Sequence, residues 1–343
     1  MPDLTSVRKR RRDWVETSPA LSGRDADLVR LLREDARRPL EQLAAELGMA
    51  KKTVRRHMDD LARRGAFRVT AVGRPSMLGY GAVATAGLQV DGSRPLRAIA
   101  ADVGRGAHVV HCAAVSGRYQ ILTELWCAGD EDLIAAADGL AGIAGVSGYE
   151  LHPRLSVAYQ TPAFASSRGV PEPVGTLSPV SLDELDRGIV ARLRDDGRVT
   201  YQALAAELRV TDGQARGRVL RLRECGAIDV TVIADGDAVG LPIGVMLAIR
   251  TVAGALIAGV VDNLADVAAI SHVAVTAGRF QLLAELACRD AADLHDVLET
   301  RIRRIAGISA IEPWVYLAVV KDDWAGMTRI VDRSQQQSSN HRI

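Results

Sequence analysis

Two short stretches of the sequence are nearly identical: residues 117–122 read Gly-Arg-Tyr-Gln-Ile-Leu, and residues 278–283 read Gly-Arg-Phe-Gln-Leu-Leu. They lie 161 positions apart, and the same offset places the Leu-Ala-Ala-Glu-Leu of residues 43–47 on that of residues 204–208. A match that persists at one offset over such a distance indicates an internal repeat.

The repeat covers most of the chain. After one residue of slip, Ile-Ala-Gly-Val-Ser at 143–147 matches Ile-Ala-Gly-Ile-Ser at 305–309, so the copies span about residues 21–160 and 182–321. Two copies are too few for a solenoid. The sequence therefore predicts a tandem duplication, a pseudo-dimer fused in one chain.

Composition limits the class of protein. The 343 residues are 25% charged, 48% hydrophobic and 4% aromatic, which is typical of a soluble globular chain and excludes a collagen-like or wholly disordered one. Lysine plus arginine number 43 against 42 acidic residues, so the net charge of +1 favours no partner by itself. The 4 cysteines contain no Cys-x-x-Cys pair, which argues against a metal site or disulfides and for a cytoplasmic protein.

No membrane partner is predicted. The basic run Arg8–Arg12 precedes no apolar core, so we expect no secretory signal. Residues 241–261 are apolar apart from Arg250, but that charge and Gly254 favour a strand, a turn and a buried helix over a membrane span.

Each copy begins with three helical patterns. In the first copy the apolar stripes consist of Leu28, Leu31 and Leu32, then Leu40, Leu43, Ala44 and Leu47, then Val54, Met58 and Leu61. Gly48 makes a short turn between the second and third helices, Gly65 stops the third, and residues 67–70 lead out as a strand. This spacing predicts a winged-helix-like helix-turn-helix domain, although a purely structural three-helix domain shares the pattern.

The rest of each copy reads strand, helix, strand, strand, helix, strand. In the first copy these elements are expected at about 81–90, 95–103, 108–116, 119–128, 131–141 and 146–159. In the second they are expected at about 242–252, 254–265, 268–276, 280–288, 291–304 and 308–320. The order is ferredoxin-like (βαββαβ), so the predicted fold class is α+β. In the strand expected at 119–128, one face is too apolar to be exposed to solvent and too polar to lie in a hydrophobic core. This favours packing of the sheet against the sheet of the other copy.

The predicted domains follow from these boundaries. They are a basic arm at 1–20, a helix-turn-helix domain at 21–74, a ferredoxin-like effector domain at 75–160, a Pro-rich linker at 161–180, a second, degenerate helix-turn-helix domain at 181–235, a second effector domain at 236–325 and a disordered tail at 326–343.

The combination resembles the Lrp/AsnC (feast/famine) family of transcription regulators, duplicated within one chain. The resemblance rests on Leu43-Ala44-x-x-Leu47-Gly48, on Thr53-Val54-x-x-x-Met58-x-x-Leu61-x-x-x-Gly65, and on the hairpin glycines Gly117 and Gly278, each followed by an arginine and an aromatic residue. It implies binding to double-stranded DNA, effector domains paired through their sheets, response to an amino acid or small metabolite, and a homo-oligomer of at least two pseudo-dimeric chains.

The third helix is the predicted reader of DNA. With its apolar residues turned inward, its outward arc is mostly cationic at the helix start, where a structural helix rarely carries such charges because its dipole is already positive. The predicted DNA contacts are Lys51, Lys52, Thr53, Arg55 and Arg56. The alternative is that these residues of the third helix are only a solvated charged face. The basic run Arg8–Arg12 is expected to be either an arm that follows the DNA phosphates or a solubilising tail.

The second copy lacks this charge. The offset converts Lys52 to Gly213 and Arg56 to Gly217, and Asp212 stands near the helix start. We expect this second helix to be structural or weakly non-specific, with its arginines at 216, 218, 221 and 223 available to the DNA backbone.

The hairpins are the candidate effector site. Family members that bind amino acids typically carry Gly-Asp-Tyr-Asp there, whereas this chain places arginine and glutamine at the acidic positions. Arginine suits a carboxylate or phosphate, so a small anionic metabolite, a changed pose or no ligand are all open. The candidate residues are Arg118, Gln120, Arg279 and Gln281, and the alternative is a hairpin tip that forms a salt bridge to a neighbouring chain.

Catalysis has little support. No nucleophile elbow, Walker loop, zinc-binding His-Glu-x-x-His or dinucleotide fingerprint occurs, so no cofactor and no catalytic residue are predicted. His111 and His272 occupy equivalent strand positions. They keep one enzyme alternative open, because the siroheme decarboxylases share this two-part architecture and use histidine and arginine; a hydrogen-bonded structural histidine is the commoner case.

Overall fold

The computed structural model describes residue 21 and residues 23–73, 75–160, 182–234, 236 and 240–322. The predicted basic arm, linker and tail lie outside the described residues. The chain groups into two compact units that each draw on both copies. Among the described residues, one unit consists of those in the ranges 21–81 and 182–234, and the other of those in the ranges 82–160 and 236–322. We call them the helix-turn-helix unit and the barrel unit.

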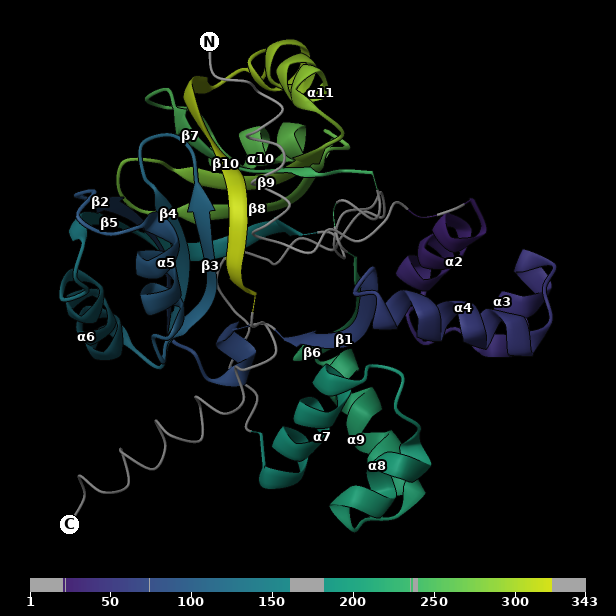
Figure 1. Ribbon diagram of the computed structural model, residues 1–343. Helices are drawn as coiled ribbons and strands as arrows, with labels where there is room; N and C mark the ends of the chain where they lie inside the picture. Colours follow the sequence, from purple (N-terminus) through teal and green to yellow (C-terminus); the bar gives the residue numbers. More distant parts are fainter. Residues whose placement is uncertain are drawn as a thin grey trace, which may run out of the picture. The chain divides into compact units, whose positions relative to one another are not determined.

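The helix-turn-helix unit repeats one order of elements. In the first copy these are α2 (Gly23–Glu34), α3 (Leu40–Leu47), α4 (Lys51–Arg63), β1 (Phe67–Gly73) and the short helix η1 (Pro75–Leu78). In the second they are α7 (Glu184–Asp195), α8 (Tyr201–Leu208), α9 (Asp212–Glu224) and β6 (Ile228–Ala234) (Figure 1). Residues 75–81, which the sequence placed with the effector domain, group with this unit.

Apolar stripes hold each set of three helices together. Leu32, Leu43, Val54 and Leu61 are fully buried, as their helical spacing predicts. Gly48 ends α3 in the left-handed conformation with φ 61°. The equivalent position in the second copy is Arg209, whose φ of 56° carries a side chain into that region at a cost of roughly 1 kcal/mol.

The two helix-turn-helix domains join through an antiparallel ribbon. Strand β1 pairs with β6, and Thr70 lies opposite Thr231, the residue 161 positions later. On either side of this central pair the contacts are reciprocal: Phe67 lies opposite Ala234, and Gly73 lies opposite Ile228, the counterpart of Phe67. This is the arrangement of an isologous two-fold interface. Arg37 and Arg198 reach across the same interface to the other copy's backbone.

The barrel unit has the predicted ferredoxin-like order twice. The first half consists of β2 (Ala82–Val90), α5 (Leu96–Gly104), β3 (Val109–Val115), β4 (Ile121–Cys127), α6 (Asp130–Ala141) and β5 (Val146–Gln160). The second consists of β7 (Ile243–Thr251), α10 (Ile257–Ala265), β8 (Ile270–Thr276), β9 (Leu282–Cys288), α11 (Ala291–Asp296), the π-helical turn η2 (Val297–Ile302) and β10 (Ile308–Asp322). The single helix expected at 291–304 is therefore divided.

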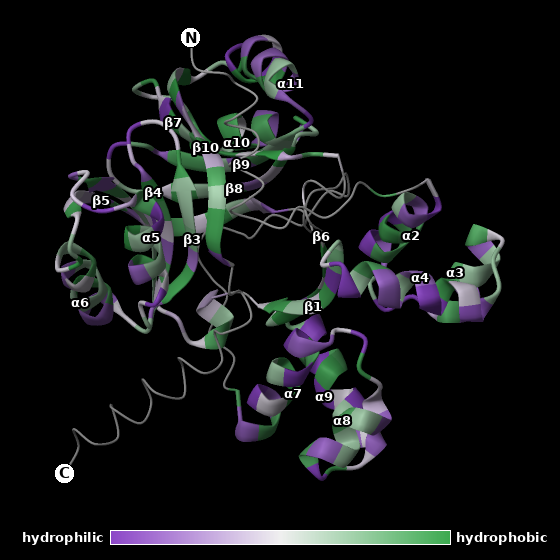
Figure 2. Ribbon diagram, in the orientation of Figure 1, coloured by the Kyte–Doolittle hydropathy of each residue, from purple (hydrophilic) through white to green (hydrophobic). Residues whose placement is uncertain are grey.

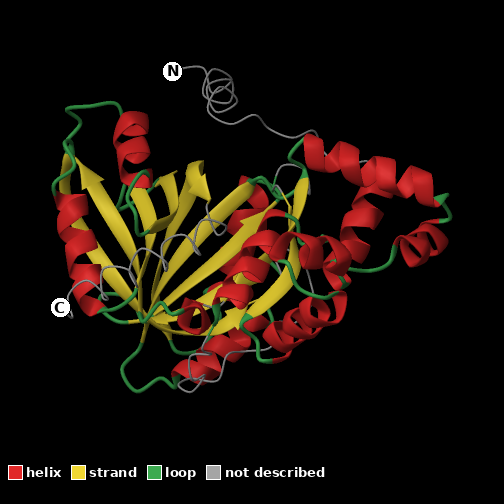
Figure 3. Ribbon diagram, turned by 90° about the horizontal axis from the view of Figure 1, so that it is seen from below, coloured by secondary structure: helices red, strands yellow, loops and turns green. Residues whose placement is uncertain are grey.

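The two sheets do not stay separate, because their longest strands join them. The strand order is β10-β3-β4-β2-β5-β8-β9-β7, closed into a barrel. Strand β5 pairs first with β2 and then with β8, and β10 pairs first with β7 and then with β3. The expected packing of sheet on sheet is thus achieved as a closed barrel, which leaves no free edge among the described strands of this unit (Figure 3).

Apolar residues fill both sides of the barrel wall. Two clusters lie between strands and helices, one around Ile99 and Leu125 and the other around Leu247 and Leu264. A third cluster joins the two halves through aromatic residues and their neighbours, with Tyr119, Phe280 and Trp314 as its largest members. Figure 2 shows the strands as predominantly hydrophobic.

The apolar stretch 241–261 has the predicted form. It contains β7, a turn at Gly254 with φ 83°, and the start of α10, whose Val260 and Leu264 are buried. Within the described residues, every helix is too short or too polar to span a bilayer.

Candidate nucleic-acid interface and barrel site

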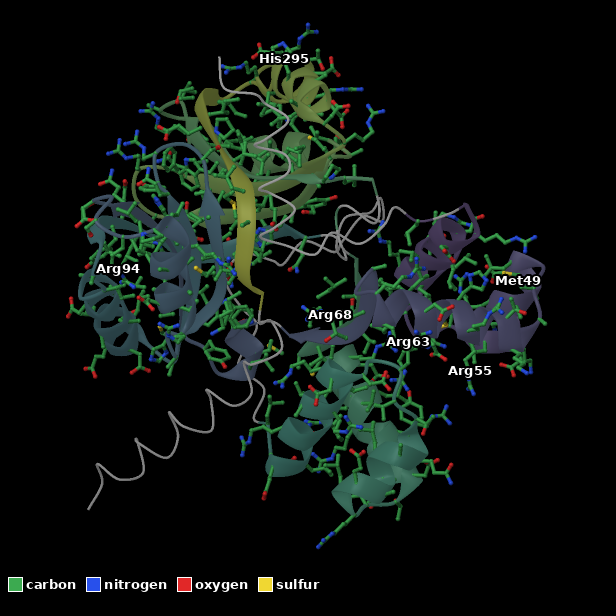
Figure 4. The ribbon with its side chains drawn as sticks, viewed as in Figure 1. Met49, Arg55, Arg63, Arg68, Arg94 and His295 are labelled. Atoms are coloured by element: carbon green, nitrogen blue, oxygen red, sulfur yellow. The ribbon has the colours of Figure 1, made fainter. Side chains whose placement is uncertain are left out.

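Helix α4 presents a cationic surface. Val54 and Leu61 face the core, while Lys52, Arg55 and Arg56 are exposed. None of these three cations has an ion-pair partner among the described residues, and Figure 4 shows Arg55 extending away from the helix. The other predicted contacts differ, because Lys51 pairs with Glu41 and Thr53 is only partly exposed.

The start of α4 lacks the side-chain features that usually cap a helix. Its N-cap is Ala50, which provides no side-chain cap, and its first turn contains no acidic residue. The first backbone N–H groups of a helix have no partner within the helix. They and the neighbouring cations thus favour an anion at this end.

A histidine anchors α4 to α2. His57 Nδ1 lies 2.7 Å from Asp25 Oδ1, and the carboxylate of Asp25 is nearly buried. This pair was not predicted from the sequence, because the two residues are 32 positions apart and only the packing of α4 on α2 brings them together.

Helix α9 uses its arginines internally. Arg218 Nη1 lies 2.6 Å from Asp183 Oδ2 and 3.1 Å from Asp186 Oδ1, and Arg221 also pairs with Asp186, which is 1% exposed. Asp183 and then Asp186 raise the pKa of Arg218. Two of the four arginines that we expected to be available to DNA are therefore engaged within the domain.

The hairpin arginines form ion pairs across the two halves of the barrel. Arg118 donates to both carboxylate oxygens of Glu312 at 2.9 and 3.0 Å, and Arg279 Nε donates to Glu150 at 3.0 Å. Glu312 raises the pKa of Arg118. The alternative expected from the sequence was a salt bridge to a neighbouring chain; the ion pairs seen here lie within one chain.

The hairpin glutamines bind backbone. The side-chain oxygen of Gln120 accepts from the Val90 N–H at 3.2 Å, and that of Gln281 accepts from the Thr251 N–H at 3.1 Å. These contacts tie each hairpin to the neighbouring strand of its own half.

A polar group not singled out from the sequence lies inside the barrel. Tyr119 donates its hydroxyl to Glu150 Oε2 at 2.5 Å and lies 3.3 Å from Nε2 of His152, which is fully buried. Burial and then Glu150 raise the pKa of Tyr119, while burial lowers the pKa of His152 against the opposing effect of Glu150. The counterparts of Tyr119 and His152 in the second half are Phe280 and Trp314, so the site is asymmetric.

The paired histidines on the strands have unlike surroundings. The ring of His111 lies 5.8 Å from that of Tyr316. Burial and then Arg154 lower the pKa of His272 to about 4. Arg154 donates to Glu124 at 3.0 Å. Within the described residues, no group of three or more His, Cys, Asp or Glu side chains is arranged to hold a metal ion.

Two domain models match the chain. The AsnC-type helix-turn-helix domain matches residues 24–61 and again residues 182–223. A C-terminal dimeric alpha+beta barrel domain of AsnC-type regulators matches residues 248–328. Both helix-turn-helix predictions are thereby confirmed.

Similar curated proteins correspond in length to one half of this chain. The regulatory protein AsnC of Escherichia coli (strain K12) is 28% identical over 142 residues, 40% of this chain and 90% of that protein. The transcriptional regulator AldR of Mycobacterium tuberculosis is 28% identical over 160 residues, 46% and 86% respectively. The transcriptional regulator FL11 of Pyrococcus abyssi is 27% identical over 144 residues, 42% and 94%.

Some solved structures match both halves of the chain together. The siroheme decarboxylase NirDL covers 91% of this chain and 100% of its own, with a TM-score of 0.61 and 17% identity. This identity is too low to transfer chemistry, so the likeness concerns the fold. The chain therefore contains two AsnC-type helix-turn-helix domains and, in its second half, the C-terminal α+β barrel domain of AsnC-type regulators.

Proposed function

We propose that the protein is a cytoplasmic, sequence-specific DNA-binding transcription regulator that reads DNA with α4. The observation that carries the proposal is the exposed, unpaired set Lys52, Arg55 and Arg56 on the third helix of an AsnC-type domain. A recognition helix of this kind enters the major groove with its N-terminal residues at the base edges. Lys51 and Thr53 complete the proposed contact surface.

A binding experiment tests this proposal. The full chain is mixed with duplexes that it enriches from a random-sequence pool, and the dissociation constant is measured by fluorescence anisotropy between about 50 and 200 mM salt. We expect a specific, salt-sensitive complex. The absence of any enriched sequence would refute the proposal.

We further propose that a small anionic metabolite or an amino acid modulates binding through Arg118, Gln120, Arg279 and Gln281. A ligand carboxylate or phosphate would compete with Glu312 for Arg118 and with Glu150 for Arg279. Ligand binding is then coupled to the two contacts that join the barrel halves. Thermal shifts with single amino acids and small anions, compared between wild type and Arg118→Ala/Arg279→Ala, test this.

The enzyme alternative has weaker support. Its strongest feature is the likeness of fold to NirDL, but Arg154 near His272 is already paired with Glu124. The regulator proposal also accounts for the cations of α4, which a tetrapyrrole enzyme does not need. We expect no change in Soret absorbance when siroheme is mixed with the protein.

A further inference from the structure

The two recognition helices of the helix-turn-helix unit occupy equivalent positions but have different surfaces. We infer that α4 alone reads DNA sequence, so that each chain recognises a single half-site, while α9 serves as a scaffold. The inference rests on the proposed DNA-binding function and specifies its partner: a duplex with one specifically read half-site for each chain.

The first support is charge. At the positions of Lys52 and Arg56, α9 carries Gly213 and Gly217, both exposed. Neither glycine has any neighbouring atom within 4 Å of the place where a Cβ would lie, so this surface is open rather than covered by protein. Leu220, which stands where α4 has Asp59, is 37% exposed. Arg216, at the position of Arg55, is still an exposed cation, but α9 lacks the two cations beside it that α4 could use to bind phosphates or guanine edges.

The second support is the engagement of two of the four arginines of α9 within the domain. Arg218 and Arg221 converge on Asp186, a carboxylate that is 1% exposed and also takes part in the capping of α7. Moving either arginine to DNA would weaken the neutralisation of a buried charge, which is costly. The equivalent carboxylate in the first domain, Asp25, pairs with His57 and leaves the cations of α4 exposed.

The third support is the capping of the two helices. Thr211 Oγ1 accepts from the Gln214 N–H, and Gln214 Oε1 accepts from the Thr211 N–H, so a capping box occupies the start of α9. Asp212 adds a negative charge in the first turn. The start of α4 has neither feature. A phosphate is therefore repelled at α9 and attracted at α4.

The interface between the domains indicates what α9 does instead. The β1–β6 ribbon and the reciprocal contacts of Arg37 and Arg198 hold the second domain in the place that a partner subunit takes in a two-fold dimer. The second domain thus supports the first one while contributing no base readout. A palindromic operator would need two chains.

A matched pair of double variants tests the inference. Both Lys52→Ala/Arg56→Ala in α4 and Arg216→Ala/Arg223→Ala in α9 remove two exposed cations and spare the Asp186 contacts. The probe is the duplex enriched by the wild-type chain, compared with a scrambled duplex of equal length. We expect the α4 variant to lose roughly tenfold or more in affinity for the enriched duplex and most of its preference over the scrambled one. The α9 variant should keep that preference.

Stoichiometry gives a second readout. The mass of the complex should correspond to one chain for each copy of the enriched half-site. A single chain that protects both halves of a palindrome, or equal loss of preference in the two variants, would overturn the inference while leaving the proposed function intact. If the wild type enriches no sequence, the proposed function fails and the inference fails with it. Circular dichroism spectra matching wild type confirm that each variant is folded.

Discussion

Arg37 and Arg198 bind each other's loops. Arg37 donates to the carbonyls of Gly197 and Val199 at 2.7 and 2.9 Å, and Arg198 donates to those of Ala36 and Arg38 at 2.6 and 2.8 Å. The two arginines are equivalent residues of the two copies, 161 positions apart, and they make equivalent contacts in opposite directions. Burial and then Arg37 lower the pKa of Arg198.

We therefore expect Arg37→Ala/Arg198→Ala to destabilise the pairing of the helix-turn-helix domains. Four charged hydrogen bonds to partly buried carbonyls are lost, which should lower the free energy of unfolding by roughly 3 kcal/mol. Urea unfolding and amide hydrogen exchange in β1 and β6 measure the effect. The control is Arg30→Ala, which breaks an exposed pair with Glu34 and should cost less than about 1 kcal/mol. Equal losses in the two proteins would contradict this role.

The Arg118–Glu312 pair should contribute measurably to barrel closure. Its bidentate geometry and side-chain exposures of 34% and 27% predict a coupling energy of about 1 kcal/mol in a double-mutant cycle with alanine. The exposed pair of Arg303 with Glu299, one helical turn apart, is the control and should give about 0.4 kcal/mol. A coupling near zero for Arg118 and Glu312 would show that the arginine is available to a ligand at little energetic cost.

The order of elements could be predicted because it depends on local patterns. The apolar stripes of the helices and the alternation of the strands follow from neighbouring residues, and the repeat at 161 supported each assignment with a second copy. Barrel closure could not be predicted in this way. Strands β5 and β10 each run for 15 residues and change partners midway, which depends on pairing with segments far along the chain.

The site was predictable to the same limited extent. The outward cations of α4 follow from helical periodicity, so Lys52, Arg55 and Arg56 could be placed on its surface. The partners of Arg218 and Arg118 could not, because the acidic residues that bind them lie 32 or more positions away and reach them only through tertiary packing.

The barrel should lose stability in mild acid. The folded-state pKa of His272 is about 4, below the ordinary 6.5, because burial and then Arg154 disfavour its charged form. The unfolded chain therefore takes up the proton first. The contribution of His272 to the free energy of unfolding is fully present above pH 6.5 and falls as the pH drops toward 4. Below pH 4 this residue causes no further change.

Between pH 7.5 and 5.5 we expect His272 alone to cost about 1 kcal/mol of unfolding free energy. Urea unfolding of wild type and His272→Gln at the two pH values isolates its share. Burial also lowers the pKa of His152, so this residue should add to the loss of stability in the wild type. Its contribution should remain in the His272→Gln variant. A pH dependence identical in wild type and variant would show that His272 is not responsible.

Two substitutions should give α9 a surface that binds DNA. Gly213→Lys/Gly217→Arg restores the two cations that α4 carries at the equivalent positions, and both sites are open. Because each phosphate contact contributes about 0.9 to the slope of log affinity against log salt, the slope should steepen by up to about 2. Fluorescence anisotropy on a fixed duplex measures it. Gly213→Ala/Gly217→Ala is the control, since it raises helix propensity by about 1 kcal/mol for each residue without adding charge and should leave the slope unchanged. If both variants bind as the wild type does, α9 lies away from the duplex altogether, and its role is confined to the interface held by Arg37 and Arg198.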